Sequence, residues 1–331
     1  MQVVTPGPGW LPDILENAGI PVSQSYMRGA GWLRTMGLLI REVRRNKIDV
    51  VHTHLTRSAY IGHALGLLTR VPIITSVHIA NNDQIYRRLA RRKNKLVAVS
   101  NFVRGMLHGR GIPERYIETI YNGTDFADFE RSPRESVYDE FGIPHSRRLV
   151  GLVGRVCRDK GQIELIDAMK SVRKDHPDAH VMFVGLVEEA FRGDVDEAIA
   201  RNGLQDHVTI TGVRHDIPRL LDSFTLSTLP SYMETFGVAA IEAMARSKAV
   251  VATRVGALPE VVRHQQTGLL VDLRPNEIAE AVSYLLENNG VRDEMGWQGR
   301  NLVEQKFTLT EMANRFEHVY AAAKFGKSSM G

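Results

Sequence analysis

The feature that most constrains the fold of this chain is a regular alternation of short apolar runs with longer helical stretches. The apolar runs, rich in β-branched residues, lie at 49–52, 72–77, 96–99, 117–121, 149–153, 180–184, 208–211, 225–229 and 249–252. In the first half, the helical stretches between them lie at 32–46, 58–69 and 102–109. Strands that alternate with helices form parallel sheets, because the chain returns through a helical crossover. The sequence therefore predicts an α/β protein with two doubly wound parallel sheets.

A segment that combines glycine, proline and charge separates the two halves and is the expected linker. It reads DEFGIPHSRR and covers Asp139 to Arg148. We therefore expect a Rossmann-like N-terminal domain at 1–145, a second Rossmann-like domain at 146–308, and a C-terminal helix at 309–331 that packs back towards the first domain. Open α/β sheets bind ligands beyond the carboxyl ends of their strands. The site is therefore expected in the central cleft between the domains.

Composition excludes several classes of protein. The chain has 331 residues and a single cysteine, Cys157, so it has neither a disulfide framework nor a cysteine-rich zinc site. No apolar window approaches the roughly 18 residues that span a membrane. The start, MQVVTPGPGW, lacks the pattern of a signal peptide. We therefore expect a cytoplasmic protein.

Positive charge concentrates in the first half, where residues 1–147 hold 20 Lys and Arg against 13 Asp and Glu. The densest run is YRRLARRKNK, and its cations are Arg87, Arg88, Arg91, Arg92, Lys93 and Lys95. Such a run suits an anionic membrane surface, at about 1 kcal/mol per cation. A solvated helix face explains it equally well. The first reading favours peripheral association at the inner face of the cell membrane, and we expect no nucleic-acid partner.

Two glycine-containing segments of the second half are candidates for contacts with a nucleotide. In GLVGRVCRDKG (151–161), Gly154 permits close backbone approach, while Arg155 and Lys160 supply a planar fork and a flexible point charge for a diphosphate. The following helix adds partial positive charge. This spacing matches neither a Walker loop nor a dinucleotide fingerprint, so a basic surface loop also explains it. Gly212 ends an apolar run where free backbone can pair with a planar base, and an ordinary turn explains it as well.

The segment SYMETFGVAAIEAMARS (231–247) holds two glutamates in small, apolar surroundings. On one helix, eight residues would set Glu234 and Glu242 about 80° apart, so Glu234 is better placed in the loop before the helix. There it lies beside Thr235, Phe236 and Gly237, where free helix amides bind a phosphate or hydroxyl. Glu242 falls in the second turn, from which it can accept hydrogen bonds from ligand hydroxyls. A solvated helix glutamate explains Glu242 equally well.

The motifs together resemble the retaining glycosyltransferases of the GT-B fold that form family 4, also called group 1 glycosyl transferases. The matching segments, in order, are DVVHTH (49–54), VPIITSVH (71–78), LVAVSNFVRGML (96–107), YNGTD (121–125), GRVCRDKG (154–161), LPSYMETFGVAAIEAMA (229–245), VVATRVGALPEVV (250–262) and QTGLLV (266–271). They keep the family's order and spacing over nearly the whole chain. Several motifs in register are more specific than any one of them.

The resemblance implies roles for the donor half of the cleft. Glu234 matches a glutamate near the hydroxyls of the donor sugar, and Glu242 matches one that binds the ribose of the nucleotide. Arg155 and Lys160 match the pair that neutralises the departing diphosphate without a metal or other cofactor. Gly212 matches the turn beside the nucleobase.

The resemblance also implies roles for the opposite half. His78 matches a histidine that faces the transferred sugar, so it is a catalytic candidate together with Arg155, Lys160 and Glu234. Asn122 matches an asparagine near the domain interface, and His54 lies at a strand end where it lines the acceptor side. The spacing of His52 and His54 suits a metal pair, but no carboxylate cluster accompanies them, and we expect no metal.

The activity that the resemblance implies is transfer of a hexose from a nucleoside-diphosphate sugar to a lipid-linked, lipopolysaccharide or exopolysaccharide acceptor. A nucleotide-sugar epimerase of the same architecture and a truncated, inactive homologue are the alternatives. The family normally opens with a strand, a glycine-rich turn and a helix, whereas this chain begins at the later segment VVTPGPG. We therefore expect an N-terminal domain without its first strand, turn and helix. Ser247 and Ala249 also replace a glycine and a proline that are common in the family.

Overall fold

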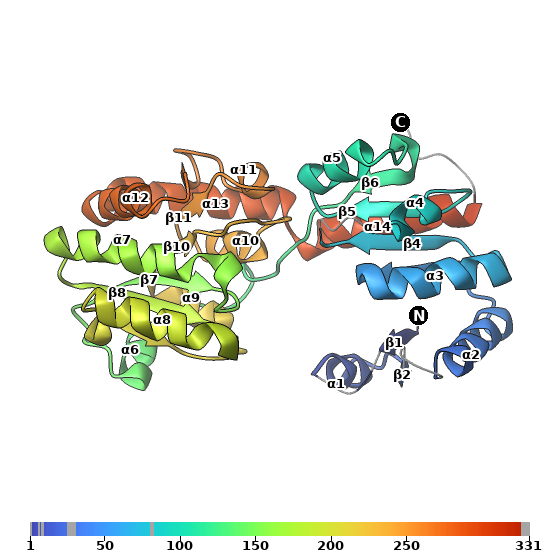
Figure 1. The fold of residues 1–331 in the computed structure, drawn as a ribbon, viewed down its shortest axis with the longest axis horizontal. Helices are drawn as coiled ribbons and strands as arrows, with labels where there is room; N and C mark the ends of the chain where they lie inside the picture. The colour runs from blue at the N-terminus through green and yellow to red at the C-terminus, as the bar shows by residue number, and fades with distance from the viewer. Residues whose placement is uncertain (1, 6, 8–9, 25–30, 80–82, 326–331) are drawn as a thin grey trace.

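The computed structural model describes residues 2–5, 7, 10–24, 31–79 and 83–325, and its strands form three parallel sheets (Figure 1). The sheet of the first half has the spatial order β3 (Val51–His54), β4 (Ile73–Val77), β5 (Lys95–Ala98), β6 (Ile117–Thr119). The sheet of the second half has the order β12 (Gly268–Val271), β11 (Val250–Thr253), β10 (Phe224–Leu229), β7 (Arg148–Val153), β8 (Ala179–Val184), β9 (Val208–Ile210). A third sheet pairs β1 (Val3–Thr5) with β2 (Val22–Gln24). The predicted α/β class with two main parallel sheets is confirmed.

Helices connect the successive strands. In the first half they are α1 (Trp10–Asn17), α2 (Gly31–Arg45), α3 (Leu55–Thr69), α4 (Ile85–Leu89) and α5 (Asn101–Gly109). In the second half they are α6 (Glu135–Phe141), α7 (Gln162–Asp175), α8 (Glu189–Arg201), α9 (Ile217–Ser223), α10 (Val238–Ala245), α11 (Leu258–Val261), α12 (Pro275–Glu287) and α13 (Asn289–Lys306). The last helix, α14 (Leu309–Phe325), follows α13 directly.

The central strands are buried on both faces, which explains why their sequences are nearly continuous apolar runs. All residues of β4 and β8 are buried. Between β7 and β10, Gly151 allows the ring of Phe224 to lie against the backbone, because a Cβ atom at residue 151 would approach that ring to 1.9 Å. This close packing holds β7 and β10 side by side, and their carboxyl ends open into the same part of the molecule.

The chain crosses between the domains twice, and the two crossings lie against each other. Thr124 pairs with Thr308 in an isolated bridge, and the backbone N–H of Thr124 donates to the carbonyl of Phe307 at 2.9 Å. After the second crossing, α14 lies against the first sheet, where Val319 and Ala323 join the cluster of buried side chains from β4, β5 and the segment after β6. The C-terminal helix is therefore built into the N-terminal domain.

The linker predicted at 139–148, and with it the domain boundary at 145/146, lies too late in the sequence. Residues 135–141 form α6, which packs against α9 of the second domain. Tyr138 is buried, and Glu140 accepts a hydrogen bond from Arg214 of the second domain at 2.8 Å. Gly142 has a φ of 61° and ends α6 as a left-handed cap. The glycine and charges therefore belong to a docked helix, and the crossing lies between β6 and α6.

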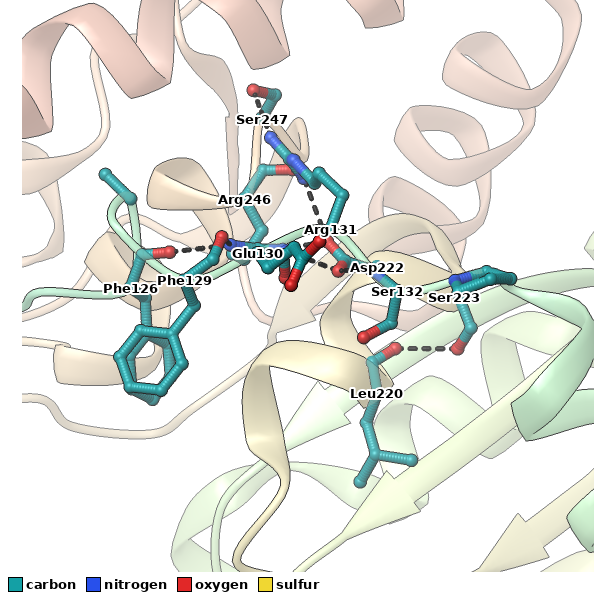
Figure 2. A network of polar contacts seen from close by, with 12 residues as sticks. Phe126, Phe129, Glu130, Arg131, Ser132, Leu220, Asp222, Ser223, Arg246 and Ser247 are labelled. Carbon is teal, nitrogen blue, oxygen red and sulfur yellow. Dashed lines mark hydrogen bonds and ion pairs between the residues drawn. The ribbon is translucent and has the colours of Figure 1, made fainter.

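A buried arginine makes several of the hydrogen bonds that hold the crossing segment to the second domain (Figure 2). Arg246 has a fully buried side chain, and its guanidinium donates to the carbonyls of Phe126 at 2.8 Å, Phe129 at 2.6 Å and Glu130 at 3.1 Å. The same guanidinium forms two hydrogen bonds with Asp222. Burial alone would raise the pKa of Asp222, but these bonds hold that pKa below its ordinary value. The charge is therefore fully partnered, and the guanidinium fixes three residues of the crossing.

Replacing this arginine tests its role in the fold. Arg246→Ala is expected to lower the free energy of unfolding by about 3–5 kcal/mol, because it leaves Asp222 buried without its main partner. Urea denaturation measures the change. The matched control is Arg192→Ala, since Arg192 pairs on the surface with Asp196 one helical turn away and is expected to cost about 0.5 kcal/mol or less. Equal costs for the two variants would contradict the assignment.

Candidate active site

The carboxyl ends of β7 and β10 bring together the predicted basic loop and the predicted glutamate loop. The Nζ atom of Lys160 forms an ion pair with the Oε1 atom of Glu234, and Ser231 Oγ donates to the same oxygen at 3.0 Å. The side chains of Lys160 and Glu234 are 25% and 13% exposed. The two loops meet because β7 and β10 are adjacent in the sheet. A cation and a carboxylate thus stand together at the strand ends, where open α/β sheets bind ligands.

The basic loop packs directly on the glutamate loop. Gly161 has a φ of 71°, and a Cβ atom there would lie 1.8 Å from the carbonyl oxygen of Pro230. Gly154 lies beside the side chain of Lys160, whose Cε atom is 4.0 Å from the position of a Cβ at residue 154. The side chain of Arg155 turns elsewhere and forms an ion pair with Glu188, just before α8. The structure therefore joins Lys160 to Glu234 but leaves Arg155 on a separate, exposed pair.

The loop after β10 is fixed from both domains. The backbone N–H of Ala257 donates to the carbonyl of Glu234 at 2.9 Å. Thr235 Oγ1 donates to the carbonyl of His78 at 2.7 Å, and the carbonyl of Thr235 accepts from Ser100 Oγ at 2.6 Å. His78 and Ser100 both belong to the N-terminal domain. Thr235 was predicted to bind the donor, but its hydroxyl and carbonyl are already used to join the two halves of the chain.

The residues that follow Thr235 form the start of α10. Phe236 is 2% exposed, and its ring packs near Tyr121 and Phe307. Its predicted contact with a donor is therefore limited to its backbone. Gly237 is the N-cap of α10 with a φ of 95°, a conformation that favours glycine. The apolar character of this segment thus serves packing at the junction of the two domains.

Glu242 stands in the second turn of α10 in surroundings unlike those of Glu234. Within the described part of the chain its carboxylate has no hydrogen-bond or ion-pair partner. Burial, with a smaller contribution from the nearby carboxylate of Asp125, raises the pKa of Glu242 to about 7. Desolvation penalises the ionised form of an unpartnered acid. A ligand that donates hydrogen bonds to this carboxylate would supply the partners that the described residues do not provide.

The histidines of the first sheet form two hydrogen-bonded groups. His54 Nδ1 lies 3.2 Å from His78 Nε2, and the two rings are stacked. His52 instead contacts Ser76 Oγ at 2.8 Å and the hydroxyl of Tyr320 on α14 at 2.7 Å. Burial lowers the pKa of His78 to about 4 and that of His52 to about 3, with smaller contributions from neighbouring histidines. These imidazoles are therefore neutral near pH 7, so His54 and His78 share a single proton between the facing nitrogens.

The remaining predicted positions lie around this centre. Gly212 follows β9, and its carbonyl accepts from the N–H of Gly185 at 2.9 Å. This places Gly212 at the end of β8, the strand next to β7. Asn122 lies in the first crossing segment, beside Gly123, whose Cβ position would lie 2.3 Å from the carbonyl of Thr308. The expected roles of Gly212 at the base, and of Asn122 and His54 on the acceptor side, stay predictions.

One contact at the cleft was not expected from the sequence. Glu260 on α11 accepts hydrogen bonds from the backbone N–H groups of Asn101 at 2.8 Å and Phe102 at 2.6 Å, and from the hydroxyl of Tyr121 at 3.0 Å. Glu260 belongs to the segment VVATRVGALPEVV (250–262), in which a proline followed by a glutamate is typical of the start of a helix. Its partners are more than 130 residues away in the sequence. No local pattern identifies such a pair.

Two absences concern the residues that the structure describes. Among them, no three or more His, Cys, Asp or Glu side chains are grouped in a way that would hold a metal ion. None of the helices in the described ranges combines the length and apolar character needed to cross a membrane.

Comparison with known protein families shows to which family the chain belongs. Residues 134–302 match the family described as Glycosyl transferases group 1, and residues 1–128 match Glycosyltransferase Family 4. The chain belongs to this family of GT-B glycosyltransferases, and the resemblance seen in its motifs is confirmed. Its enzyme class is glycosyltransferase.

Individual relatives agree with this assignment. The chain is 28% identical over 307 residues to alpha-maltose-1-phosphate synthase of Mycolicibacterium smegmatis, covering 82% of this chain and 78% of that protein. It is 24% identical to N-acetyl-alpha-D-glucosaminyl L-malate synthase of Bacillus anthracis, covering 84% and 75%. Among solved structures, a glycosyltransferase from Rickettsia africae has a TM-score of 0.88 at 23% identity, covering 98% and 90%. Anabaena HepE, in complex with UDP-glucose, has a TM-score of 0.88 at 22% identity, covering 97% and 91%. These structures share the fold.

The close packing of the two loops predicts the effect of one substitution. Gly161→Ala places a Cβ against the carbonyl of Pro230 and forces a left-handed backbone on alanine, so we expect a loss of about 1–3 kcal/mol from backbone strain alone. The basic loop should move away from Glu234. The control is Gly193→Ala in the middle of α8, where a Cβ meets no atom within 4 Å and is expected to add about 0.5–1 kcal/mol of stability. Thermal unfolding of both variants distinguishes them, and two stabilised proteins would contradict the packing.

Proposed function

We propose that this protein is a metal-independent, retaining hexosyltransferase that moves a hexose from a nucleoside-diphosphate sugar to a lipid-linked, lipopolysaccharide or exopolysaccharide acceptor. The observation that carries the proposal is the pair of Lys160 and Glu234 at the carboxyl ends of β7 and β10. His78 of the opposite domain is joined to the same loop through Thr235. A cation for phosphate and a carboxylate for sugar hydroxyls thus stand together, and the backbone of His78 contacts the loop that carries the carboxylate.

Transfer of the sugar requires polar groups at two places, the sugar and the leaving diphosphate. When the bond between the anomeric carbon and the diphosphate oxygen breaks, positive charge develops on the sugar and negative charge on the leaving diphosphate. In the proposed step Lys160 leaves its pair with Glu234 and, together with Arg155, stabilises the diphosphate. Glu234 then accepts hydrogen bonds from the sugar. The acceptor oxygen attacks from the same face, and its proton passes to the leaving phosphate, which retains the anomeric configuration.

The nucleoside lies, in this proposal, along the ends of β8 and α10. The ribose hydroxyls donate to Glu242, which supports the ionised form that burial disfavours. The base pairs with backbone near Gly212. Because HepE, which shares the fold, was crystallised with UDP-glucose, UDP-glucose is the first donor to test.

The basic run lies at the edge of the first sheet opposite to the carboxyl ends that carry His54 and His78. Arg91, Arg92 and Lys93 line a pocket of about 290 Å³ together with Arg70, at the amino-terminal side of β4 and β5, and none of the described residues that line it is acidic. Lys95 differs from its neighbours, because it is paired with Glu118 at 2.8 Å. We propose that this basic surface contacts anionic lipid at the inner face of the membrane.

A nucleotide screen tests the proposed donor site. Ligand that binds only the folded state raises stability by RT ln(1 + [L]/Kd), so one of UDP, GDP and ADP should raise the melting temperature more than the others. The corresponding hexose donor should then be hydrolysed slowly. Lys160→Ala is expected to lower this turnover by about 10²-fold, the scale found on removing one donor to a transition state. Lys170→Ala, exposed on α7, is the control.

The outcomes of this screen distinguish the alternatives. Release of an isomerised sugar nucleotide would favour the epimerase. No stabilisation by any of the three nucleotides would favour an inactive homologue. Unchanged turnover in Lys160→Ala would contradict the role given to Lys160.

The raised pKa of Glu242 predicts how nucleotide binding depends on pH. Hydrogen bonds from the ribose favour the ionised carboxylate, so binding lowers a pKa that is about 7 in the free protein. Below pH 7 the free protein must release a proton to bind, and Kd should rise by up to about tenfold per pH unit; above pH 7 this contribution is flat. Calorimetric titration between pH 5.5 and 8 measures it. The Glu242→Gln variant lacks the titrating carboxyl group, so the pH dependence of its Kd reports the titration of the nucleotide itself. An equal pH slope in both proteins would therefore exclude the contact.

A further inference from the structure

Glu260 makes an unusual contact for a glutamate, because its carboxylate caps the N-terminus of α5, a helix of the other domain. Its two oxygens accept from the N–H groups of Asn101 at 2.8 Å and Phe102 at 2.6 Å, the first residues of α5. The hydroxyl of Tyr121, also in the N-terminal domain, donates to one of these oxygens at 3.0 Å. Three donors of one domain therefore converge on one carboxylate of the other.

The physical basis of this contact is the end of α5. The first N–H groups of a helix have no partner within the helix and carry partial positive charge. Ser100 Oγ, the N-cap, accepts from the N–H of Val103 at 3.1 Å, which leaves the N–H groups of Asn101 and Phe102 for an external acceptor. Hydrogen bonds from such groups to an ionised carboxylate are roughly twice as strong as neutral ones. The contact is therefore directional and fixes α5 relative to α11.

The segment 256–260, which carries Glu260, also contacts the loop of Glu234. Ala257 lies three residues before Glu260, and its backbone N–H donates to the carbonyl of Glu234 at 2.9 Å. Gly256 lies so close that a Cβ there would be 2.0 Å from this carbonyl oxygen. Residues 256–260 thus contact the Glu234 loop at one end and α5 at the other.

We propose that Glu260 is a positioning residue for glycosyl transfer: it sets the distance between the His78 side of the cleft and the Lys160–Glu234 side. The proposal rests on the donor site described above. Glu260 is already occupied by three donors, so its role is to place other groups. A displacement of about 1 Å between reacting groups can cost about 10²-fold in rate. The two sides belong to different domains, and such a displacement follows when their relative position is no longer fixed.

Three substitutions test this role. Glu260→Ala removes the acceptor, and Glu260→Gln keeps the shape but places an amide N–H₂ against one of the N–H donors. Glu277→Ala is the matched control, because Glu277 accepts from the backbone N–H of Asp272 at 2.8 Å within the second domain alone. All three remove a carboxylate that accepts from backbone, but only Glu260 accepts across the domain boundary. A role confined to local stability therefore predicts an unchanged distance between the domains for both residues.

The first readout needs no ligand. Spin labels on cysteines introduced at residue 108 on α5 and residue 280 on α12, both exposed, report the distance between the domains; the native Cys157 is buried. We expect one narrow distance distribution for the labelled parent and for Glu277→Ala, and a broad distribution for Glu260→Ala and Glu260→Gln. This result is independent of whether the donor site is assigned correctly.

The second readout separates binding from turnover. Kd is measured for UDP, GDP and ADP, and hydrolysis for UDP-glucose, GDP-mannose and ADP-glucose. Glu260→Ala should keep the nucleotide Kd of the parent within about threefold, because the proposed nucleotide contacts lie in the second domain, while kcat falls by about 10²-fold. A narrow parental distance distribution in Glu260→Ala, or parental kcat in that variant, would overturn the proposal. If no nucleotide binds the parent protein, the proposed function fails, and the distance measurement still decides the role of Glu260.

Discussion

The loop that carries Glu234 and Thr235 is the constraint on which the rest of the site depends. Its carbonyl groups and its threonine hydroxyl are bonded to Ala257 on one side and to His78 and Ser100 of the opposite domain on the other. These bonds bring the ends of β4, β7 and β10 to one place. Together with the crossings near Thr124 and Thr308 and the contact of Glu260 with α5, they join two parallel-sheet domains that each carry half of the candidate site.

The two glutamates of this region differ in their electrostatic surroundings. Glu234 is paired with Lys160 and bonded to Ser231, so its charge is satisfied before any ligand arrives. Glu242 has no such partner among the described residues, and burial raises its pKa to about 7. The apolar sequence around both residues is therefore compatible with one charged and one partly protonated carboxyl group. A donor sugar nucleotide would exchange the first pair for a phosphate contact and give the second its missing hydrogen bonds.

The sequence predicts the fold well where the signal is local. Alternating apolar runs and helices define parallel crossovers, and the expected strands of the second sheet agree with β7 to β11 within one residue at their starts. Local signals failed where the same residues serve another purpose: the glycine and charges at 139–148 cap and dock α6 instead of forming a linker. Contacts between distant residues were not predictable, as with Glu260 and Asn101, 159 residues apart, because each partner resembles an ordinary helix terminus when considered alone. Motif resemblance assigned Lys160 and Glu234 to the donor half of the cleft, but it predicted neither their ion pair nor the bonds by which Thr235 joins the domains.

A crystal structure with bound nucleoside diphosphate would test the central claim most directly, because the claim concerns which atoms meet the diphosphate. We expect the diphosphate within hydrogen-bonding distance of Lys160 Nζ, the pair between Lys160 and Glu234 broken, and the ribose hydroxyls on Glu242. A nucleotide bound elsewhere, with Lys160 still paired to Glu234, would contradict the account.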